Sequence, residues 1–577
     1  SGGNNMLEID AGYALAGNVV STSGATQGGD TLALGGSANA SFDLGQVGAV
    51  GSEASIQGFA NFAKTGSSTW ALTGTGNASQ AWTIADGTLA GNTTSLVGNV
   101  AFAPGAGDTA VVEFDQAQSG TYAGTLSGDG TLLKTGSAAL TLTGTNTYTG
   151  GTALDAGTLV LGNASAIGSG SLMMAEGTTL DFTSGFTLAN AIILSGDPTI
   201  NVGSGLSTTL GGGISDGTQA GDLVKTGAGT LVLTGADTYT GGTAVSAGTL
   251  DVEGSLASSV SVGNGATLIG TGSMGGMTIV SGATVAPGGN GVGTLRVNGN
   301  VSIASGSSYQ VDAIDTGSSD LIHATGTAAL GGGSVISTEA GSHWNVSTKY
   351  TILTAESGVS GSFGSTTSNF AFLTPTLSYD ANHAYLTLVR NNVALTSVGV
   401  TPNEIHTGAA IEALGYGNAI YNAIVPLAAG PARAAFNQLA GDSLASTRTA
   451  IIDDSRYVRD AINNHLQGVQ GAGGIAQQDA QGGAWVSAWG HGGNHDSDGN
   501  AGRLSSNGSG LLVGADRDLG TWRLGAVAGA GQLSNNRTDA PNDAHSTDTV
   551  LGLYTGVDLG AWQLHGGAAH SWYETRS

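Results

Sequence analysis

The sequence has no cysteine, few prolines and few charged residues. Its 577 residues include 8 prolines and 101 glycines, and only 10% of the side chains are charged. The shortage of proline, with no strict Gly-X-Y period, excludes a collagen-like chain. The low charge, beside 40% hydrophobic residues, argues against a disordered chain. Because one compact core rarely serves a chain of this length, we expect a repeat or solenoid architecture.

The absence of cysteine has two interpretations. Either the protein is cytosolic and has no use for thiols, or the chain stays unfolded while it crosses an oxidising compartment, where a disulfide would lock a loop. The sequence shows no signal peptide and no apolar run of the roughly 18–20 residues that a membrane helix needs. Since the chain opens at Ser1 without methionine and stops at Ser577, we expect both ends to be cut points within a longer protein.

Positive charge is scarce as well. The formal net charge is −26; residues 1–390 hold 25 acidic and 6 basic side chains, and residues 391–577 hold 16 and 9. Nucleic-acid binding depends on lysine and arginine side chains that neutralise phosphates, so we predict no nucleic-acid partner. An acidic chain of this kind instead suits a surface exposed to water and salt.

The chain does contain an internal repeat. Three segments, 62–90, 131–162 and 222–254, align with one another. In each, a Lys-Thr-Gly is followed, 25 residues after its lysine, by the leucine of a Gly-Thr-Leu. Three of the four lysines in the sequence occupy this one position of the repeat: Lys64, Lys134 and Lys225.

Each repeat has the pattern of short strands joined by glycine-rich turns. In residues 230–234, Thr-Leu-Val-Leu-Thr, polar and apolar side chains alternate, so that one face can be buried and the other exposed. One unit cannot cover its own apolar face, whereas stacked units can, with each strand pairing in parallel one coil away. We therefore predict an all-β fold, a right-handed parallel β-helix over residues 1–390, with about 15–20 coils of roughly 20–25 residues in a rod of about 70–95 Å. The alternative is an array of β-sandwiches.

The three segments resemble the autotransporter-associated β-strand repeat, which has the series Lys-Thr-Gly, Leu-Thr-Gly, Tyr-Thr-Gly-Gly-Thr and Ala-Gly-Thr-Leu. The second and third copies match nearly throughout, while the first has Asn-Ala-Ser-Gln at 77–80 in place of the tyrosine turn. Residues 270–301 and 350–390 resemble the late coils of such passengers. The resemblance implies a β-helical passenger over 1–340 and C-terminal, autochaperone-like passenger coils over 341–390 that fold first during export.

A change of composition follows the predicted β-helix. We expect residues 391–482 to form a linker, in which 445–466 carries apolar side chains at helical spacing and 467–483 is rich in glycine and glutamine. Residues 483–577 resemble the first strands of an autotransporter β-barrel, which is an antiparallel barrel of the outer membrane.

Two features of residues 483–577 support that resemblance. Short connections at 518–522 and 558–562 alternate with longer polar loops at 492–507 and 534–548, as periplasmic turns and extracellular loops do. Five of the eight tryptophans lie between Trp485 and Trp572, where we expect an aromatic girdle at the membrane interface. About five strands fit, too few to close a barrel, and an open strand edge in lipid is forbidden, so we expect the natural chain to continue.

The motifs that suggest catalysis or metal binding all lack a part. Gly441-Asp442-Ser443-Leu444 spells the nucleophile motif of one lipase class, but it falls in the helical linker without a strand before it. Residues 270–275 fit Gly-x-Gly-x-x-Gly with no helix after them, and residues 495–500 lack the glutamate that completes a calcium loop. The ten histidines show no metal-ligand spacing. We predict no enzymatic activity, no metal site and no cofactor, although residues that meet across coils are not visible in a sequence.

Asn463 and Asn464 have an assigned chemistry only under the resemblance. Some autotransporters release their passenger by self-cleavage at paired asparagines in the helix inside the barrel, and this pair lies about 20 residues before Trp485. In that reaction the side chain of the first asparagine attacks its own backbone carbonyl, and acidic residues of the barrel assist. The alternative is a passenger that stays attached or is cut elsewhere.

The resemblance implies a barrel in the outer membrane of a Gram-negative bacterium and a passenger at the cell surface or outside the cell. We predict a function in adhesion, autoaggregation or biofilm formation. The expected partners are a host surface, a glycan or a second copy of the chain, and the outer membrane with its barrel-assembly machinery. Two alternatives remain: a structural stalk for a functional domain upstream, and a passenger hydrolase, for which the coil-like sequence leaves little room.

Overall fold

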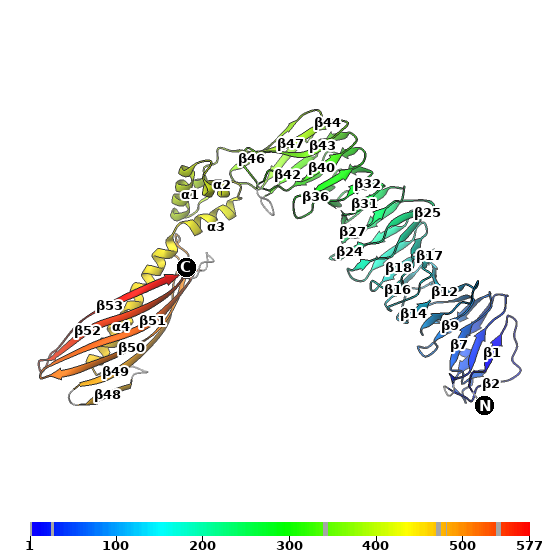
Figure 1. Ribbon diagram of the computed structural model, residues 1–577, viewed down its shortest axis with the longest axis horizontal. Helices are drawn as coiled ribbons and strands as arrows, with labels where there is room; N and C mark the ends of the chain where they lie inside the picture. The colour runs from blue at the N-terminus through cyan, green and yellow to red at the C-terminus, as the bar shows by residue number, and fades with distance from the viewer. Residues whose placement is uncertain are drawn as a thin grey trace. The chain divides into compact units, whose positions relative to one another are not determined.

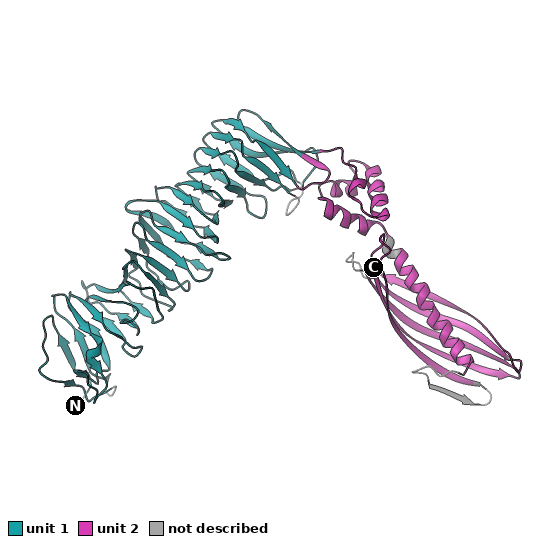
Figure 2. Cartoon of the chain, turned by 180° about the vertical axis from the view of Figure 1, so that it is seen from behind, with its two compact units in different colours: residues 1–368, 375–389 teal, residues 369–374, 390–577 magenta. Residues whose placement is uncertain are grey.

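The computed structural model of the chain describes residues 3–24, 28–314, 316–338, 344–468, 475–479, 482–537 and 544–576 (Figure 1). The chain divides into two compact units (Figure 2). The first unit comprises residues 1–368 and 375–389, and the second comprises residues 369–374 and 390–577. The unit boundary near residue 390 lies where the sequence loses its glycine-threonine pattern.

The first unit is a parallel β-helix, as the sequence predicts. In its later coils each turn of the helix contributes one strand to each of three sheets, and strands three apart in number pair in parallel. For example, β29 (Thr243–Val245) pairs with β32 (Ser259–Val262), and β30 (Thr249–Val252) pairs with β33 (Thr267–Gly270). Figure 1 shows these strands stacked side by side, coil upon coil.

Among the described residues, four sheets account for most of the β-helix. Their first and last strands are as follows: twelve strands from β13 (Gly120–Tyr122) to β44 (Val359–Ser362), nine from β4 (Ala40–Asp43) to β25 (Ile214–Gly221), nine from β21 (Thr187–Leu188) to β45 (Ser365–Ser368), and eight from β28 (Ala236–Asp237) to β46 (Leu373–Tyr379).

The core of the β-helix consists of in-register rows of aliphatic and aromatic side chains. Leu231, Leu250 and Leu268 lie in one such row, each paired with the next, and none of the three is exposed to solvent. The residues on either side of each leucine face outward, which is the alternation that the sequence shows. Burial of such rows between neighbouring coils is the main term that stabilises a solenoid.

The coils vary in length more than the predicted 20–25 residues. Leu268 lies beside Val285, 17 residues on, whereas Ser334 lies beside Ser365, 31 residues on. The strands keep their register while the connections between them absorb the difference, because surface loops tolerate insertions at little cost in free energy.

The C-terminal end of the β-helix departs from parallel pairing. Strand β43 (Lys349–Ala355) pairs antiparallel with β47 (His383–Arg390), and β46 lies next to β47 at the end of that sheet. This hairpin covers the last coil, whose edge would otherwise present unpaired backbone groups. It falls within the segment 341–390 that resembles the last passenger coils.

The second unit begins with helices. They are α1 (Pro402–Leu414), α2 (Ala419–Ile424), α3 (Ala429–Leu439) and α4 (Asp442–Leu466). Helix α4 is the helix predicted over 445–466, whereas no separate helix is predicted at the other three. None of the helices in the described part of the chain is long and apolar enough to cross a membrane.

The rest of the second unit is an antiparallel sheet of six strands in chain order. The strands are β48 (Ile475–Asp479), β49 (Gly482–His495), β50 (Leu504–Leu519), β51 (Trp522–Arg537), β52 (Ala544–Asp558) and β53 (Gln563–Arg576). Both predicted short turns are present, and Gly520 and Gly560 in them have φ of 74° and 81°.

Two predictions for this region are wrong in their bounds. Strand β48 lies inside the predicted linker 467–483, of which residues 469–474 and 480–481 are outside the described residues. The loop predicted at 492–507 is confined to 496–503, and of the loop predicted at 534–548 the residues up to 537 and from 544 are strand, while 538–543 are not described. Polar residues continue the backbone pairing there, so composition does not mark the strand ends.

Candidate functional site

Helix α4 lies along one face of the antiparallel sheet, as Figure 2 shows, and contacts strands β49 to β53. The contact is a hydrophobic cluster in which Val458 and Ile462 of α4 meet side chains from four strands. The strand residues of this cluster are Trp485, Leu512, Val527, Val550 and Tyr554, all less than 5% exposed. This face of the sheet is therefore the inner face, and α4 is packed against it.

The direction of α4 along the sheet is fixed by contacts at its two ends. Ala450, near the start of α4, packs with Leu504 and Leu533, at the end of the sheet with the longer loop 496–503. Leu466, its last residue, lies at the opposite end, where it lines a cavity together with Trp522 of a short turn. The chain therefore runs through α4 from the longer-loop end to the short-turn end.

The helices before α4 are tied to the longer-loop end. The amide N–H of Asn403, in α1, donates to Oδ1 of Asn500 in loop 496–503 at 2.8 Å. The side-chain amide of Asn500 in turn donates to Oδ1 of Asn403 at 3.1 Å. The reciprocal pair fixes α1 at the end of the sheet where α4 begins.

Histidine–aspartate pairs join α4 to the sheet. His465 of α4 hydrogen-bonds with Asp516 of β50, and Asp454 of α4 pairs with His491 of β49 at 2.8 Å. A longer contact of 3.5 Å links Asp453 of α4 to His495. Because both partners of the first two pairs are largely buried, each side chain satisfies a polar group that would otherwise lie unpaired in the interface.

An aromatic network extends the His465 pair across the sheet. The hydroxyl of Tyr554 donates to Asp516 at 2.9 Å, and the indole N–H of Trp485 donates to the Tyr554 oxygen at 2.7 Å. The His465 ring stacks on Trp485, with 4.8 Å between ring centroids. Together these bonds set the register of α4 on the sheet as well as its distance from it.

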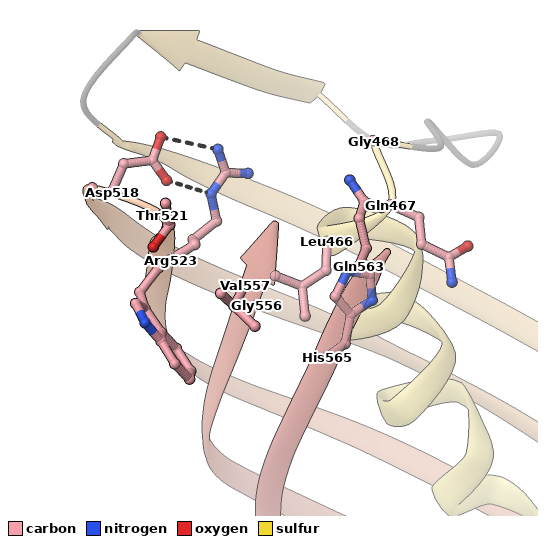
Figure 3. Close-up of a pocket in the computed structure, with 12 residues that line it drawn as sticks. Leu466, Gln467, Gly468, Asp518, Thr521, Arg523, Gly556, Val557, Gln563 and His565 are labelled. Atoms are coloured by element: carbon pink, nitrogen blue, oxygen red, sulfur yellow. Dashed lines mark hydrogen bonds and ion pairs between the residues drawn. The ribbon is translucent and has the colours of Figure 1, made fainter. Parts of the chain in front are cut away.

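The cavity at the short-turn end has a volume of about 380 Å³ and a polar lining (Figure 3). In it Arg523 donates to both carboxylate oxygens of Asp518, at 2.7 and 3.1 Å. Figure 3 shows Leu466, Gln467 and His565 around the same space. This bidentate pair balances the charge of the guanidinium within the protein.

The outer face of the sheet is apolar. Leu511, Leu551, Leu553, Leu524 and Leu564 are between 48% and 70% exposed, on strands where the alternate residues face α4. Such an alternation, apolar outward and mixed inward, is the pattern of a strand wall that faces lipid. It explains how a sheet can expose large aliphatic side chains without a partner in the protein.

The predicted aromatic girdle is only partly right. Trp522 and Trp562, at the short turns, and Trp572, nearer the other end, are 50%, 78% and 52% exposed on the outer face. Trp485 and Trp489 instead lie on the inner face with the α4 cluster. The strand-like alternation around Trp485 and Trp489 does not tell which of the two faces of the sheet is the inner one.

Comparison with known proteins agrees with this geometry. Residues 484–577 match the autotransporter beta-domain family. Residues 62–90, 132–161 and 223–252 each match the passenger-associated-transport-repeat. The chain is an autotransporter protein. The sheet of strands β49 to β53 belongs to its β-domain, which lies in the outer membrane, and the β-helix is its passenger, displayed at the cell surface or secreted.

Two curated relatives cover part of this autotransporter. Both are extracellular serine proteases of Serratia marcescens, 33% and 29% identical over 395 residues, which is 58% of this chain. The chain spans 37% of the length of these relatives. Among solved structures, the Haemophilus influenzae Hap adhesin is similar at 11% identity and a TM-score of 0.26, over 67% of this chain and 59% of that one.

The repeats of the passenger contain a second recurrent arrangement, which the sequence does not reveal. Lys64, Lys134 and Lys225 are completely buried, and the ammonium group of each donates to three backbone carbonyls. The acceptors are Thr65 (2.6 Å), Gly66 (2.6 Å) and Asp86 (3.0 Å) for Lys64; Thr135 (2.6 Å), Gly136 (2.7 Å) and Ala156 (3.0 Å) for Lys134; and Thr226 (2.8 Å), Gly227 (2.9 Å) and Ala247 (3.1 Å) for Lys225.

Burial lowers the pKa of these lysines, to about 8 for Lys64 and Lys225. With a pKa of about 8, Lys64 and Lys225 are still mainly protonated at neutral pH. The ammonium form has three donors, and three acceptors surround it, so that every N–H of the group has a partner. The recurrence of Lys-Thr-Gly in the three repeats is thus explained by the packing of its lysine in the core.

The tyrosine turn of the repeat is also internal. In the second copy the Tyr148 hydroxyl hydrogen-bonds with the Thr152 hydroxyl. In the third copy the hydroxyl oxygens of Tyr239 and Thr243 form the same hydrogen bond at 2.5 Å. Both tyrosines are fully buried. The first copy lacks this pair, and Gln80 instead accepts a bond from the Asn77 amide at 2.9 Å.

The residues that the sequence singles out for chemistry do not come together. Asn463 and Asn464 lie in α4 with exposed side chains, whereas His465 beside them faces Asp516. The lipase-like Gly441–Leu444 is at the start of α4, and the side chains of 442–444 are outside the described residues. In loop 496–503, Asp498 accepts the amides of Asn500 and Ala501 in a local turn. Residues 270–275 run from the last residue of β33 through β34 (Ser273–Met274).

The His–Asp pairs are the features of this site that sequence reasoning missed. Asp454 and His465 lie on the same side of α4, at a spacing of eleven residues, which is three helical turns. The spacing is a weak signal by itself, because their partners are on strands more than 35 residues away.

Proposed function

We propose that the passenger acts at the cell surface by contact, in adhesion, self-association or biofilm formation, and not by catalysis. The observation that carries this proposal is a row of hydroxyl side chains on the outer surface of one sheet. Eight successive strands each present a serine or threonine at the same register position, facing outward: Ser207, Thr230, Thr249, Thr267, Thr284, Ser308, Ser334 and Ser365.

A row of this kind suits a partner that also repeats. Neighbouring strands are about 4.8 Å apart, so the hydroxyls form a regular line of donors and acceptors. Each contact with a partner exchanges a hydrogen bond to water for one to the partner and gains little by itself. Many equivalent contacts along the row add up, which favours a glycan chain or the same row on a second copy.

Several observations weigh against catalysis in the described passenger. The sequence has no histidine before His323. His323 lies 3.6 Å from Glu356, and His383 is bound to Asp380 at 2.8 Å. Within the described residues no serine hydroxyl hydrogen-bonds to either ring, so no serine–histidine pair of the kind that activates a nucleophile is assembled there.

The second candidate function is a stalk for a catalytic domain outside this chain. The observation in its favour is the similarity to two extracellular serine proteases, of which the chain spans only 37%. Under this proposal the β-helix holds a protease away from the membrane. The hydroxyl row is then only the soluble outer surface of the stalk.

One comparison of variants separates these functions. In cells that display the full-length protein, Thr249→Glu with Thr267→Glu places two charges at adjacent positions of the hydroxyl row. The matched control is Thr278→Glu with Ser302→Glu, adjacent outward positions on a different sheet. We expect cell aggregation and glycan-surface binding to fall only in the row variant at equal display. Unchanged aggregation in both, or the absence of any aggregation by the wild type, would favour the stalk.

Membrane insertion has its own expected partner. We propose that the outer-membrane barrel-assembly machinery inserts strands β49 to β53 into the membrane, because their apolar outer face requires contact with lipid. Depletion of that machinery is expected to remove the passenger from the surface. Normal display without it would contradict the proposal.

A further inference from the structure

The three buried lysines occupy positions that otherwise belong to the apolar core. Lys134 lies in an interior row between Phe114 and Leu154, its partners on the neighbouring strands. Lys225 likewise lies between Ile200 and Val245. A charged group in such a row is unfavourable unless the protein supplies partners for it, because its hydration is lost.

The partners of each lysine come from two successive coils. Two of the three acceptor carbonyls belong to the residues that directly follow the lysine. The third belongs to a residue 22 positions later, in the turn of the next coil toward the C-terminus. Each ammonium group therefore bridges its own coil and the coil on its C-terminal side.

Glycine makes this bridge sterically feasible. Gly87, which follows the distant acceptor Asp86, has φ of 74°, and Gly157 and Gly248 after the other two acceptors have 73° and 70°. A Cβ at Gly87 would contact both Nζ of Lys64 and the carbonyl of Gly66. In each repeat, the Ala-Gly or Asp-Gly before Thr-Leu thus supplies the distant carbonyl, and Lys-Thr-Gly supplies the lysine and the two nearby carbonyls.

The bridge can form in only one order during export. The C-terminal end of the passenger continues into α1 to α4, which precede the strands of the β-domain. On export through that domain, we expect the coils at this end of the passenger to be nearest to the exit and to fold first. When a Lys-Thr-Gly segment emerges, the coil that holds its distant carbonyl is already in place. Before docking, the lysine ammonium is hydrated; after docking, it is held by three carbonyls in a dry core.

We propose that the three lysine bridges are latches for export, each of which secures a newly emerged coil to the coil already folded outside the cell. Reversal of a closed latch requires a buried ammonium group to lose its acceptor in the next coil before water can reach it. A segment that carries a closed latch therefore does not slip back into the barrel. The latches lie at Lys225, Lys134 and Lys64 in the order in which they emerge. The proposal rests on export through the barrel and is independent of what the displayed passenger binds.

The test is the kinetics of surface appearance in cells that express the full-length protein. Lys64→Met, Lys134→Met and Lys225→Met each keep the length of the side chain and remove its donors. The matched control is Lys349→Met, because Lys349 is an exposed lysine of the passenger that lies over the Tyr385 ring. Pulse-labelled cells are treated with an external protease at successive times, and the fragments that remain protected inside are sized.

We expect each latch variant to reach the surface about tenfold more slowly, the factor expected from loss of hydrogen bonds to one charged group. The protected fragment should depend on the position of the change. In Lys225→Met the protected fragment should contain everything N-terminal to residue 225. In Lys64→Met it should contain only the residues N-terminal to residue 64. The control should match the wild type.

A second measurement separates a latch from a merely structural lysine. The heat resistance of the fully displayed passenger is compared among the same variants. Normal export kinetics in all three variants, even with a less heat-resistant passenger, would overturn the proposal. So would an equal delay in Lys349→Met, or protected fragments that do not change with the position of the substitution. Loss of adhesion at normal export rates in the row variant, Thr249→Glu with Thr267→Glu, would bear only on the proposed contact function.

Discussion

Asp237 is a buried carboxylic acid in the core of the third repeat. Its Oδ1 accepts the amide N–H of Ile214 at 2.8 Å, and burial raises its pKa from 3.8 to about 6. The second repeat has an asparagine, Asn146, at the same position. Asn146 accepts the Leu126 amide at 2.8 Å in the same way and also donates to the carbonyl of Ala166 at 2.5 Å.

We predict that Asp237→Asn stabilises the passenger at neutral pH. A folded-state pKa near 6 against 3.8 unfolded means that the folded chain holds this proton more tightly. The stability that the acid contributes is then complete below pH 3.8 and is lost as the pH rises through 6. A shift of about two pKa units corresponds to about 3 kcal/mol at pH 7. The asparagine keeps the amide acceptor without the charge.

The assay is urea unfolding of the purified passenger, followed by circular dichroism at pH 4 and pH 7. We expect the variant to exceed the wild type in unfolding midpoint at pH 7 and to show a much smaller advantage at pH 4. Asp320, whose pKa burial raises to about 7, keeps part of the pH dependence in both proteins. The exposed Asp197→Asn is the control. An advantage that does not depend on pH, or a variant less stable at pH 7, would refute the reasoning.

Three further predictions follow from other parts of the chain. Before Arg296 the only basic side chains are the three buried lysines, so the surface of this part of the passenger is acidic. Because salt screens like charges, self-association of the passenger should strengthen when salt is raised from about 20 to 150 mM, whereas binding to a cationic partner should weaken. Sedimentation at both salt concentrations distinguishes the two. Glu404→Ala removes a buried carboxylate that accepts hydrogen bonds from the Val400 and Thr401 amides and from the Asn437 side chain. It should destabilise α1 to α3 by about 2–3 kcal/mol, which faster amide exchange in these helices would show. Glu412→Ala is the less buried comparison. If the passenger is released at the paired asparagines, mass spectrometry of the secreted fragment will show an end at Asn463 that Asn463→Ala abolishes, and an end elsewhere would show that another site is used.

The general architecture was predictable because it depends on local alternation. Thr-Leu-Val-Leu at 230–233 shows which side chains are buried, and a repeat that cannot cover itself implies stacking. The apolar spacing of 445–466 marks α4, and Gly520 and Gly560 mark the short turns, since both need positive φ. In each case the signal and the structure lie within a few residues of each other.

The rest depends on contacts that are distant in sequence. Lys134 is expected to be exposed by residue type, and its burial is explained by three carbonyl acceptors, one of them on Ala156 in the next coil. Trp485 faces α4 and Trp522 faces outward, although both lie near the start of their strands. The partners of His465 and His491 become visible only when α4 lies on the sheet, and the antiparallel pairing of β43 with β47 interrupts a regular parallel pattern without a local cue.

The central claim is that the β-helix lies outside the cell and that α4 enters the barrel from the longer-loop end. Because the chain has no cysteine, single cysteines can report this topology directly. Asp197→Cys in the passenger, Ser497→Cys in loop 496–503 and Thr521→Cys in a short turn are introduced separately into the full-length protein. Intact cells are treated with a thiol reagent that does not cross the outer membrane. We predict labelling at 197 and 497, and labelling at 521 only after the outer membrane is opened. Labelling at 521 in intact cells, or protection of 197, would contradict the account.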